Sequence, residues 1–298
     1  MSTQWSHDAE LARDAYRRTQ QHVHVTQTTL FDSILLKRED LQTTGSFKWR
    51  GVQSMISALR SRPRGFVCVS TGNTGVAVAE AARGLKVPAH VFAPVVPGGA
   101  KASRITDARA ELHVTDESFS RTAERASAFA HANGMLYCSP GASWDFVYGV
   151  AGVGIEVLST HPDVEVIYVP VGGGGLAAGI GIVAQAMGRR VKVVGVQSDR
   201  SPYVYDYFHD VPGPTIERET GADCLAGDLE AGAVILEVGR DVLSDVLVVT
   251  ERELLQTQQK LNEAGINAEL GAVAGVSAAM RSGVADAGRT CAVITGHH

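Results

Sequence analysis

Residues 39–51 read Glu39-Asp-Leu-Gln-Thr-Thr-Gly-Ser-Phe-Lys48-Trp-Arg-Gly51, and this stretch is the most informative part of the chain. It joins a strand-like run (Ile34–Lys37) to a helical run (Trp49–Leu59). A lysine in a loop between a strand and a helix can direct its amine into a cleft, although most lysines are solvated surface charges. Lys48 is therefore a candidate reactive amine.

On the C-terminal side of this stretch, apolar strand-like runs alternate with alanine-rich helical runs. The expected strands are Phe66–Ser70, His90–Pro94, Leu112–Thr115, Met135–Ser139, Val164–Val171, Val191–Ser198, Val246–Thr250 and Cys291–Thr295. The expected helices include Val76–Gly84, Ser120–Asn133, Leu176–Met187 and Leu254–Ala264, the last opened by a capping box from Thr250 to Glu253. Pro202–Glu219 is the one long stretch that shows neither a strand pattern nor a helix pattern. This alternation predicts an α/β fold with mostly parallel sheets and helices on both faces.

The composition fits a soluble enzyme. The 298 residues are 45% hydrophobic and carry a net charge of −5, and the basic residues are scattered. We therefore expect no nucleic-acid partner, and no apolar run is long enough for a membrane span. The four cysteines are far apart in sequence, which favours free thiols and a reducing cytoplasm.

A glycine run, Gly172, Gly173, Gly174 and Gly175, follows one predicted strand and precedes a predicted helix. Its backbone N–H groups and the helix N-terminus suit a phosphate group. The run also satisfies a loose dinucleotide pattern, with Asp199 near the place of a ribose-binding acid. A phosphate cup, a dinucleotide turn and a purely structural turn all stay open on this motif alone.

A second polar loop, Ser70-Thr-Gly-Asn-Thr-Gly75, also lies between a strand and a helix. Hydroxyls and backbone amides at a helix start can bind a carboxylate. Ordinary helix capping is the simpler explanation for such a loop.

Together these segments resemble the fold-type II pyridoxal-phosphate enzymes. Residues 44–48 are similar to the lysine motif of that family, and residues 70–75 are similar to a loop of cysteine synthases and, more loosely, of dehydratases. The end of the chain, Thr295-Gly-His, resembles threonine synthase. The resemblance runs from about Thr26 to Gly296. Three segments (Leu36–Gln42, Asp223–Gly232 and Val248–Glu253) look most like the branch of serine/threonine dehydratases (threonine ammonia-lyases) and serine racemases.

The resemblance implies particular roles. Lys48 would bind pyridoxal 5'-phosphate as an imine and later remove the substrate α-proton. The other cofactor contacts implied are Asn73 to the ring oxygen, Thr295 to the pyridine nitrogen, and Gly172, Gly173, Gly174 and Gly175 to the phosphate. The substrate contacts implied are Ser70, Thr71, Gly72 and Thr74, with Thr71 also at the place of a racemase's proton-donating serine.

The resemblance also implies a two-domain, tryptophan synthase beta-like fold. Residues 1–64 and 146–298 would form the large cofactor-binding domain, and residues 65–145 the small mobile substrate domain. The chain departs from the dehydratase pattern at Thr74, where dehydratases have histidine, and at Val153, where that branch commonly has glutamine. These departures leave the substrate open, since its pocket depends on loops such as Ser143–Tyr148.

The function implied is α,β-elimination from a β-hydroxy amino acid such as threonine or serine, giving a 2-oxo acid and ammonia. A β- or γ-replacement enzyme and an amino-acid racemase are the alternatives from the same family. A nicotinamide oxidoreductase and a cofactor-binding protein without turnover are alternatives from other classes. We also expect a homodimer, and a Mg²⁺ or other divalent cation site at Glu219 and Asp223, since carboxylates four residues apart can share a hard cation.

Overall fold

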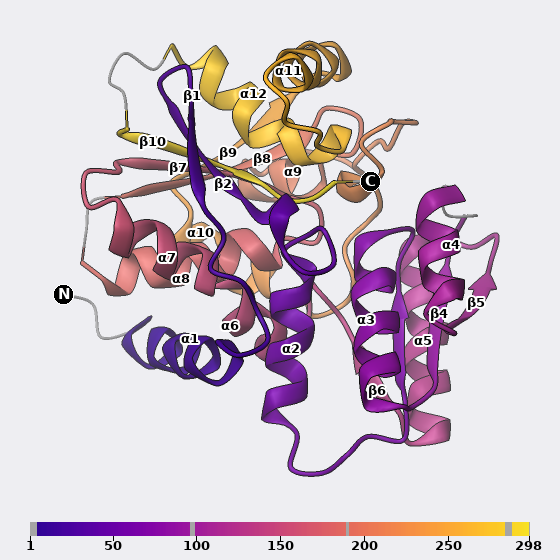
Figure 1. Cartoon of the computed structure of the whole chain (residues 1–298). Helices are drawn as coiled ribbons and strands as arrows, with labels where there is room; N and C mark the ends of the chain where they lie inside the picture. The colour runs from indigo at the N-terminus through magenta and orange to yellow at the C-terminus, as the bar shows by residue number, and fades with distance from the viewer. Residues whose placement is uncertain (1–4, 96–98, 189–190, 284–287, 298) are drawn as a thin grey trace.

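A computed structural model describes residues 5–95, 99–188, 191–283 and 288–297, and it divides the strands between two sheets (Figure 1). The larger sheet has the order β1 (Thr28–Phe31), β2 (Ile34–Arg38), β10 (Thr290–Ile294), β7 (Val166–Pro170), β8 (Lys192–Ser198) and β9 (Asp245–Val249). The smaller sheet has the order β5 (Glu111–Val114), β4 (Ala89–Ala93), β3 (Phe66–Val69) and β6 (Leu136–Cys138). Only the β1–β2 pair is antiparallel among these strands. The predicted α/β class with mostly parallel sheets is therefore confirmed.

Helices cover both faces of the larger sheet (Figure 1). One face carries α11 (Glu251–Glu263) and α12 (Ala274–Arg281); the other carries α7 (Gly152–Thr160), α8 (Gly175–Ala186) and α10 (Val234–Val242). The other α-helices that belong with the larger sheet are α1 (Ser6–Thr19), α2 (Lys48–Ala58), α6 (Trp144–Val150) and α9 (Tyr203–Phe208). Such two-sided cover explains why the central strands read as continuous apolar runs.

The smaller sheet is also covered on both faces, by α3 (Asn73–Leu85) and α4 (Gly99–Asp107) on one side and α5 (Phe119–Asn133) on the other. Alternate residues of β3 point to opposite faces of the sheet. Val67 and Val69 pack with α5, whereas Phe66 and Cys68 belong to the core cluster that includes α3. All four strands of this sheet fall within residues 65–145. The assignment of that range as a mobile domain stays a prediction.

The predicted strands and the capping box at Thr250 are confirmed, with ends that differ by a residue or two. One prediction was wrong: residues 143–148 are not a loop, because most of them lie in α6. The stretch 202–219 begins with the short helix α9 and is irregular, as predicted, from residue 209 onward. Helix α1 and strand β1 went unrecognised. Strand β1 has four residues and no apolar alternation.

The described helices include none with the length and apolar character needed to cross a membrane. All four cysteines are free, and Cys68, Cys138 and Cys291 are buried. Burial raises the pKa of each of these three thiols, so they are inert core residues.

Candidate active site

Lys48 is the first residue of α2 and lines a cavity of about 760 Å³. Burial lowers the pKa of its amine to about 8, against an opposing effect of Cys224 and Glu269. A buried amine with such a pKa is partly neutral near pH 7, and the neutral form is the nucleophile. Every site residue predicted from the sequence lines this same cavity: Lys48, Ser70, Thr71, Gly72, Asn73, Thr74, Gly172, Gly173, Gly174, Gly175, Glu219, Asp223 and Thr295.

The loop before Lys48 is tied to the C-terminal end of β10. Phe47 donates its backbone N–H to the Thr295 carbonyl (3.1 Å), and the His297 N–H donates to the Gly45 carbonyl (3.0 Å). Gly45 has φ +77°, and a Cβ there would lie 2.5 Å from the His297 ring. A side chain at residue 45 would therefore both strain the backbone and clash. This pairing brings Thr295 beside the lysine, although the two residues lie near opposite ends of the sequence.

Helix α2 is held in place by a buried ion network. The Arg50 guanidinium donates to both oxygens of Glu39 (2.7 and 2.9 Å) and to both oxygens of Glu156 (2.7 and 2.9 Å). Lys37 pairs with Glu156 as well, and all four side chains are at most 5% exposed. Burial would raise the pKa of Glu39, but Arg50 and Lys37 outweigh it and hold that pKa below its ordinary value. The network fixes the first turn of α2, which carries Lys48.

The glycine loop connects β7 to the N-terminus of α8. Added Cβ atoms would meet backbone oxygens at Gly172 (2.6 Å) and Gly175 (2.1 Å), and Ile235 at Gly174 (2.4 Å), where φ is +81°. Packing thus requires glycine at these three positions. At Gly173 a Cβ would meet only Gly141, at 3.6 Å, so packing does not explain this glycine. Its bare backbone faces the cavity at the positive end of a helix, as a phosphate site needs.

The polar loop leads from β3 into α3. The Ser70 hydroxyl accepts a hydrogen bond from the Gly72 N–H (2.9 Å), which fixes the turn. Asn73 opens the helix and is 8% exposed. Its Oδ1 is buried without a hydrogen-bond partner in the described structure. A buried, unpaired amide oxygen on a cavity wall is free to accept a hydrogen bond from a ligand.

Two charged residues that the sequence reasoning missed, Glu269 and Lys101, complete the cavity. Glu269 accepts from the Asn73 amide (2.7 Å) and from the Lys101 ammonium (2.9 Å), and it is buried. Asp223 also pairs with Lys101, at 3.1 Å. Burial disfavours the Lys101 ammonium, but the two carboxylates outweigh burial and raise the pKa of Lys101. No motif marks Lys101 or Glu269, which lie 168 residues apart and meet only in the fold.

The expected cation site at Glu219 and Asp223 stays a prediction. Both residues line the cavity, but the described structure brings Asp223 together with Cys224 and Glu269 as a possible metal-binding group, without Glu219. The Lys101 ammonium already pairs with both carboxylates of that group.

This fold and cavity define a class of α/β enzyme in which a buried lysine and a glycine-lined anion site face one substrate pocket. The chain belongs to the family of pyridoxal-phosphate dependent enzymes, whose profile matches residues 18–296. It is 33% identical over 254 residues to the L-threonine ammonia-lyase of Thermotoga maritima, covering 83% of this chain and 62% of the relative. It is 30% identical over 259 residues to the catabolic L-threonine dehydratase of Escherichia coli (strain K12), covering 85% and 78%. The crystal structure of the T.th. threonine deaminase superposes with a TM-score of 0.86 at 26% identity, covering 97% of each chain.

The cavity fits pyridoxal phosphate. Lys48 would supply the amine for covalent attachment, since it is buried and its pKa is lowered to about 8. The backbone at Gly173 would supply an anion site, since packing alone does not explain a glycine at this position. The unpaired Asn73 Oδ1 supplies a polar contact that the protein itself leaves unused. The dinucleotide alternative loses its support, because Asp199 is not among the described residues that line the cavity.

Proposed function

We propose that the chain is a pyridoxal-phosphate dependent ammonia-lyase that acts on a small β-hydroxy amino acid such as threonine or serine. The products are a 2-oxo acid and ammonia. The observation that carries the proposal is the convergence of Lys48, the polar loop at Ser70–Thr74 and the glycine loop on one cavity. The similarity to a threonine ammonia-lyase and a threonine dehydratase over more than four fifths of the chain supports the same reaction class.

When bound, the cofactor supplies an electron sink for the negative charge that develops at the substrate Cα. Lys48 would hold the cofactor through its Nζ, and the substrate amine would take that place and release Nζ. The freed Nζ would then remove the α-proton, for which a pKa of about 8 is suitable because neutral amine is available near pH 7. The hydroxyls of Ser70, Thr71 and Thr74, with the N-terminus of α3, bind the substrate carboxylate. The β-hydroxyl would leave and take up a proton, so that the substrate loses its α-proton and its hydroxyl together as one water. The released unsaturated amine would then consume one water to give the 2-oxo acid and ammonia.

Thr295 favours elimination over reactions that need a long-lived carbanion. Its side chain lines the cavity beside the lysine loop and carries a neutral hydroxyl. A hydroxyl partner does not hold a proton on the pyridine nitrogen as a carboxylate would. The electron sink is then weaker, so that the β-hydroxyl is expelled promptly.

The test is incubation of the cofactor-loaded protein with L-threonine and with L-serine, with 2-oxo acid and ammonia measured together. We expect equal amounts of both products, and none from the Lys48→Ala variant. If no β-hydroxy amino acid gave either product, the proposal would be contradicted. A parallel reaction with a sulfur nucleophile tests β-replacement, which is the second candidate because Thr74 stands where dehydratases have histidine. Chiral analysis of the remaining substrate tests racemisation at Thr71.

Three finer points belong to the same proposal. The protein acts in the cytoplasm, consistent with its free cysteines, and it forms a homodimer. A divalent cation at Glu219 and Asp223 stabilises the wall of the cavity. Light scattering tests the dimer, and the melting temperature with magnesium or a chelator tests the cation.

A further inference from the structure

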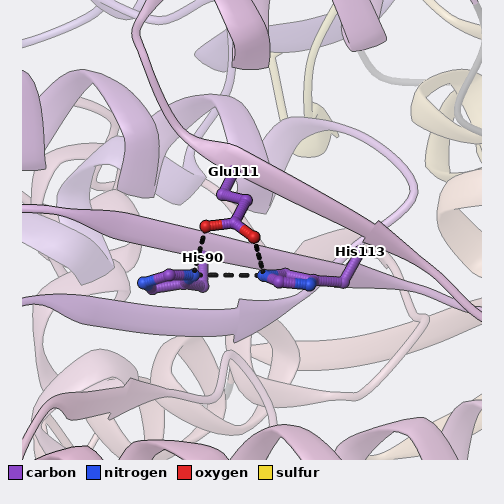
Figure 2. Close-up of side chains that lie close together, drawn as sticks. All are labelled: His90, Glu111 and His113. Atoms are coloured by element: carbon purple, nitrogen blue, oxygen red, sulfur yellow. Dashed lines mark hydrogen bonds and ion pairs between the residues drawn. The ribbon is translucent and has the colours of Figure 1, made fainter.

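Two histidines and a glutamate meet on the smaller sheet, outside the cavity (Figure 2). They come from the neighbouring parallel strands β4 and β5, in which His90 lies opposite Glu111, and Phe92 lies opposite His113. Because side chains two residues apart share a face of a strand, this register places all three polar side chains on one face of the sheet. None of the three lines the active-site cavity.

The three side chains face one another. The His90 Nδ1 and His113 Nε2 atoms are 3.1 Å apart, and the two Glu111 carboxylate oxygens lie 3.4 Å from the His90 nitrogen and 3.5 Å from the His113 nitrogen. Figure 2 shows the carboxylate above the gap between the two rings, with one oxygen toward each nitrogen. The side chains of His90 and His113 are 13% and 27% exposed, whereas that of Glu111 is 65% exposed.

Aromatic packing holds the two imidazoles in place. The His113 ring stacks on Phe92 with centroids 4.5 Å apart and an angle of 16°. The His90 ring packs against Phe129 of α5, with centroids 4.8 Å apart. Both ring positions are thus fixed by packing.

This geometry suits a transition-metal ion. Ligand atoms about 2.0–2.1 Å from a tetrahedral zinc ion are about 3.3 Å from one another, close to the separations found here. Two imidazoles and one carboxylate are also a ligand set that zinc accepts, with the remaining position left to water. We propose that His90, Glu111 and His113 form a binding site for a zinc-class divalent cation. The exposed Glu111 side gives the ion a path from solvent, and the bound ion ties the edge strand β5 to β4.

The other possible metal-binding group of the described structure, at Asp223, Cys224 and Glu269, does not compete with this assignment. The Lys101 ammonium lies 3.1 Å from Asp223 and 2.9 Å from Glu269, so both carboxylates of that group already have a cationic partner. The cluster at His90, by contrast, has no lysine or arginine among its described partners within the ion-pair distance.

The test is calorimetric titration of untagged, cofactor-loaded protein with Zn²⁺, after removal of free cofactor and bound metal. The buffer contains excess Mg²⁺, which occupies the cation site proposed at Glu219 and Asp223. Under these conditions we expect one Zn²⁺ per chain, a higher melting temperature with Zn²⁺, and visible bands of a tetrahedral ion when Co²⁺ is used. The His113→Gln and Glu111→Gln variants should each bind Zn²⁺ at least about 10–100-fold more weakly, since even outer-sphere changes cost that much.

The matched control is His131→Gln, which removes an exposed histidine from α5 of the same part of the fold. This variant should keep wild-type Zn²⁺ binding and the Co²⁺ bands. Absence of Zn²⁺ binding in the wild-type protein would overturn the proposal, as would unchanged binding in His113→Gln. Loss of binding in the His131→Gln control would also overturn it, because the site would then lie elsewhere.

Discussion

Arg50→Met should destabilise the fold strongly, because it leaves the buried network beneath α2 unbalanced. In the native chain the charges of Lys37 and Arg50 balance those of Glu39 and Glu156, and Arg50 is 1% exposed. Methionine fills much of the same volume but leaves one uncompensated buried carboxylate. Breaking a buried pair in this way costs about 3–5 kcal/mol, a large part of the roughly 5–15 kcal/mol that stabilises an ordinary domain.

The assay is urea unfolding of the cofactor-loaded protein at fixed cofactor concentration, so that cofactor binding shifts all variants alike. The control is Arg17→Met, which removes an exposed arginine paired with Asp14 on α1 and should change the unfolding free energy by less than about 0.5 kcal/mol. The double variant Arg50→Met with Glu39→Gln restores the charge balance. It should lose about 0.5–3 kcal/mol less than the sum of the two single variants.

The ion pair between Glu39 and Arg50 also predicts that the stability of the fold decreases at acid pH. Since Arg50 holds the pKa of Glu39 below its ordinary value, the contribution of Glu39 to stability is present above about pH 4.5 and is lost as the pH falls through the lowered pKa.

If Arg50→Met cost no more than its surface control, or if the double variant were simply additive, the network would not hold α2 in place.

Three further predictions concern the cavity. For the first, the rate of imine formation at Lys48 is measured on the cofactor-free protein by reductive trapping at a series of pH values. This rate should rise with pH to a plateau with a midpoint near pH 8. A rate that still rises in proportion to hydroxide at about pH 10 would contradict the lowered pKa. Gly173→Asp should weaken pyridoxal-phosphate binding by at least about tenfold (about 1.4 kcal/mol), because its carboxylate would repel the phosphate. The control Gly173→Ala should bind the cofactor nearly as well as wild type. Equal affinities for both variants would argue against a phosphate cup. Thr295→Asp should slow elimination and add a long-wavelength absorption band at unchanged cofactor occupancy, and full activity with no new band would show that Thr295 is not the partner of the ring nitrogen.

Much of the fold follows from the sequence because its signals are local. Apolar runs such as Val193–Val196 and Phe66–Val69 are covered on both faces and contain no polar side chain, so their hydrophobic character is unambiguous. The capping box at Thr250 is likewise a contact between residues close in sequence. Strand β1 escaped notice because it is short, partly exposed and antiparallel, and its place depends on pairing with β2.

The candidate site was predictable only where a motif marks it. Lys48, the glycine loop and the polar loop each lie at a strand–helix junction, and parallel strands place such junctions at one edge of a sheet. Glu269 and Lys101 lie in segments without a motif, and Glu269 meets Asn73 and Lys101 only through the packing of the two parts of the fold. The cluster at His90 depends on strand register, since shifting β5 by one residue would turn Glu111 and His113 to the other face.

The most direct test of the central claim is borohydride reduction of the cofactor-loaded protein, followed by peptide mass spectrometry. We expect a pyridoxyl group on Lys48 in stoichiometric amount, and no modified peptide from the Lys48→Ala variant. Lys37 and Lys101 are also buried in the described structure, and each forms an ion pair with a buried carboxylate, that of Glu156 and that of Glu269 respectively. A pyridoxyl group on either of them instead of Lys48 would contradict the assignment of the active site.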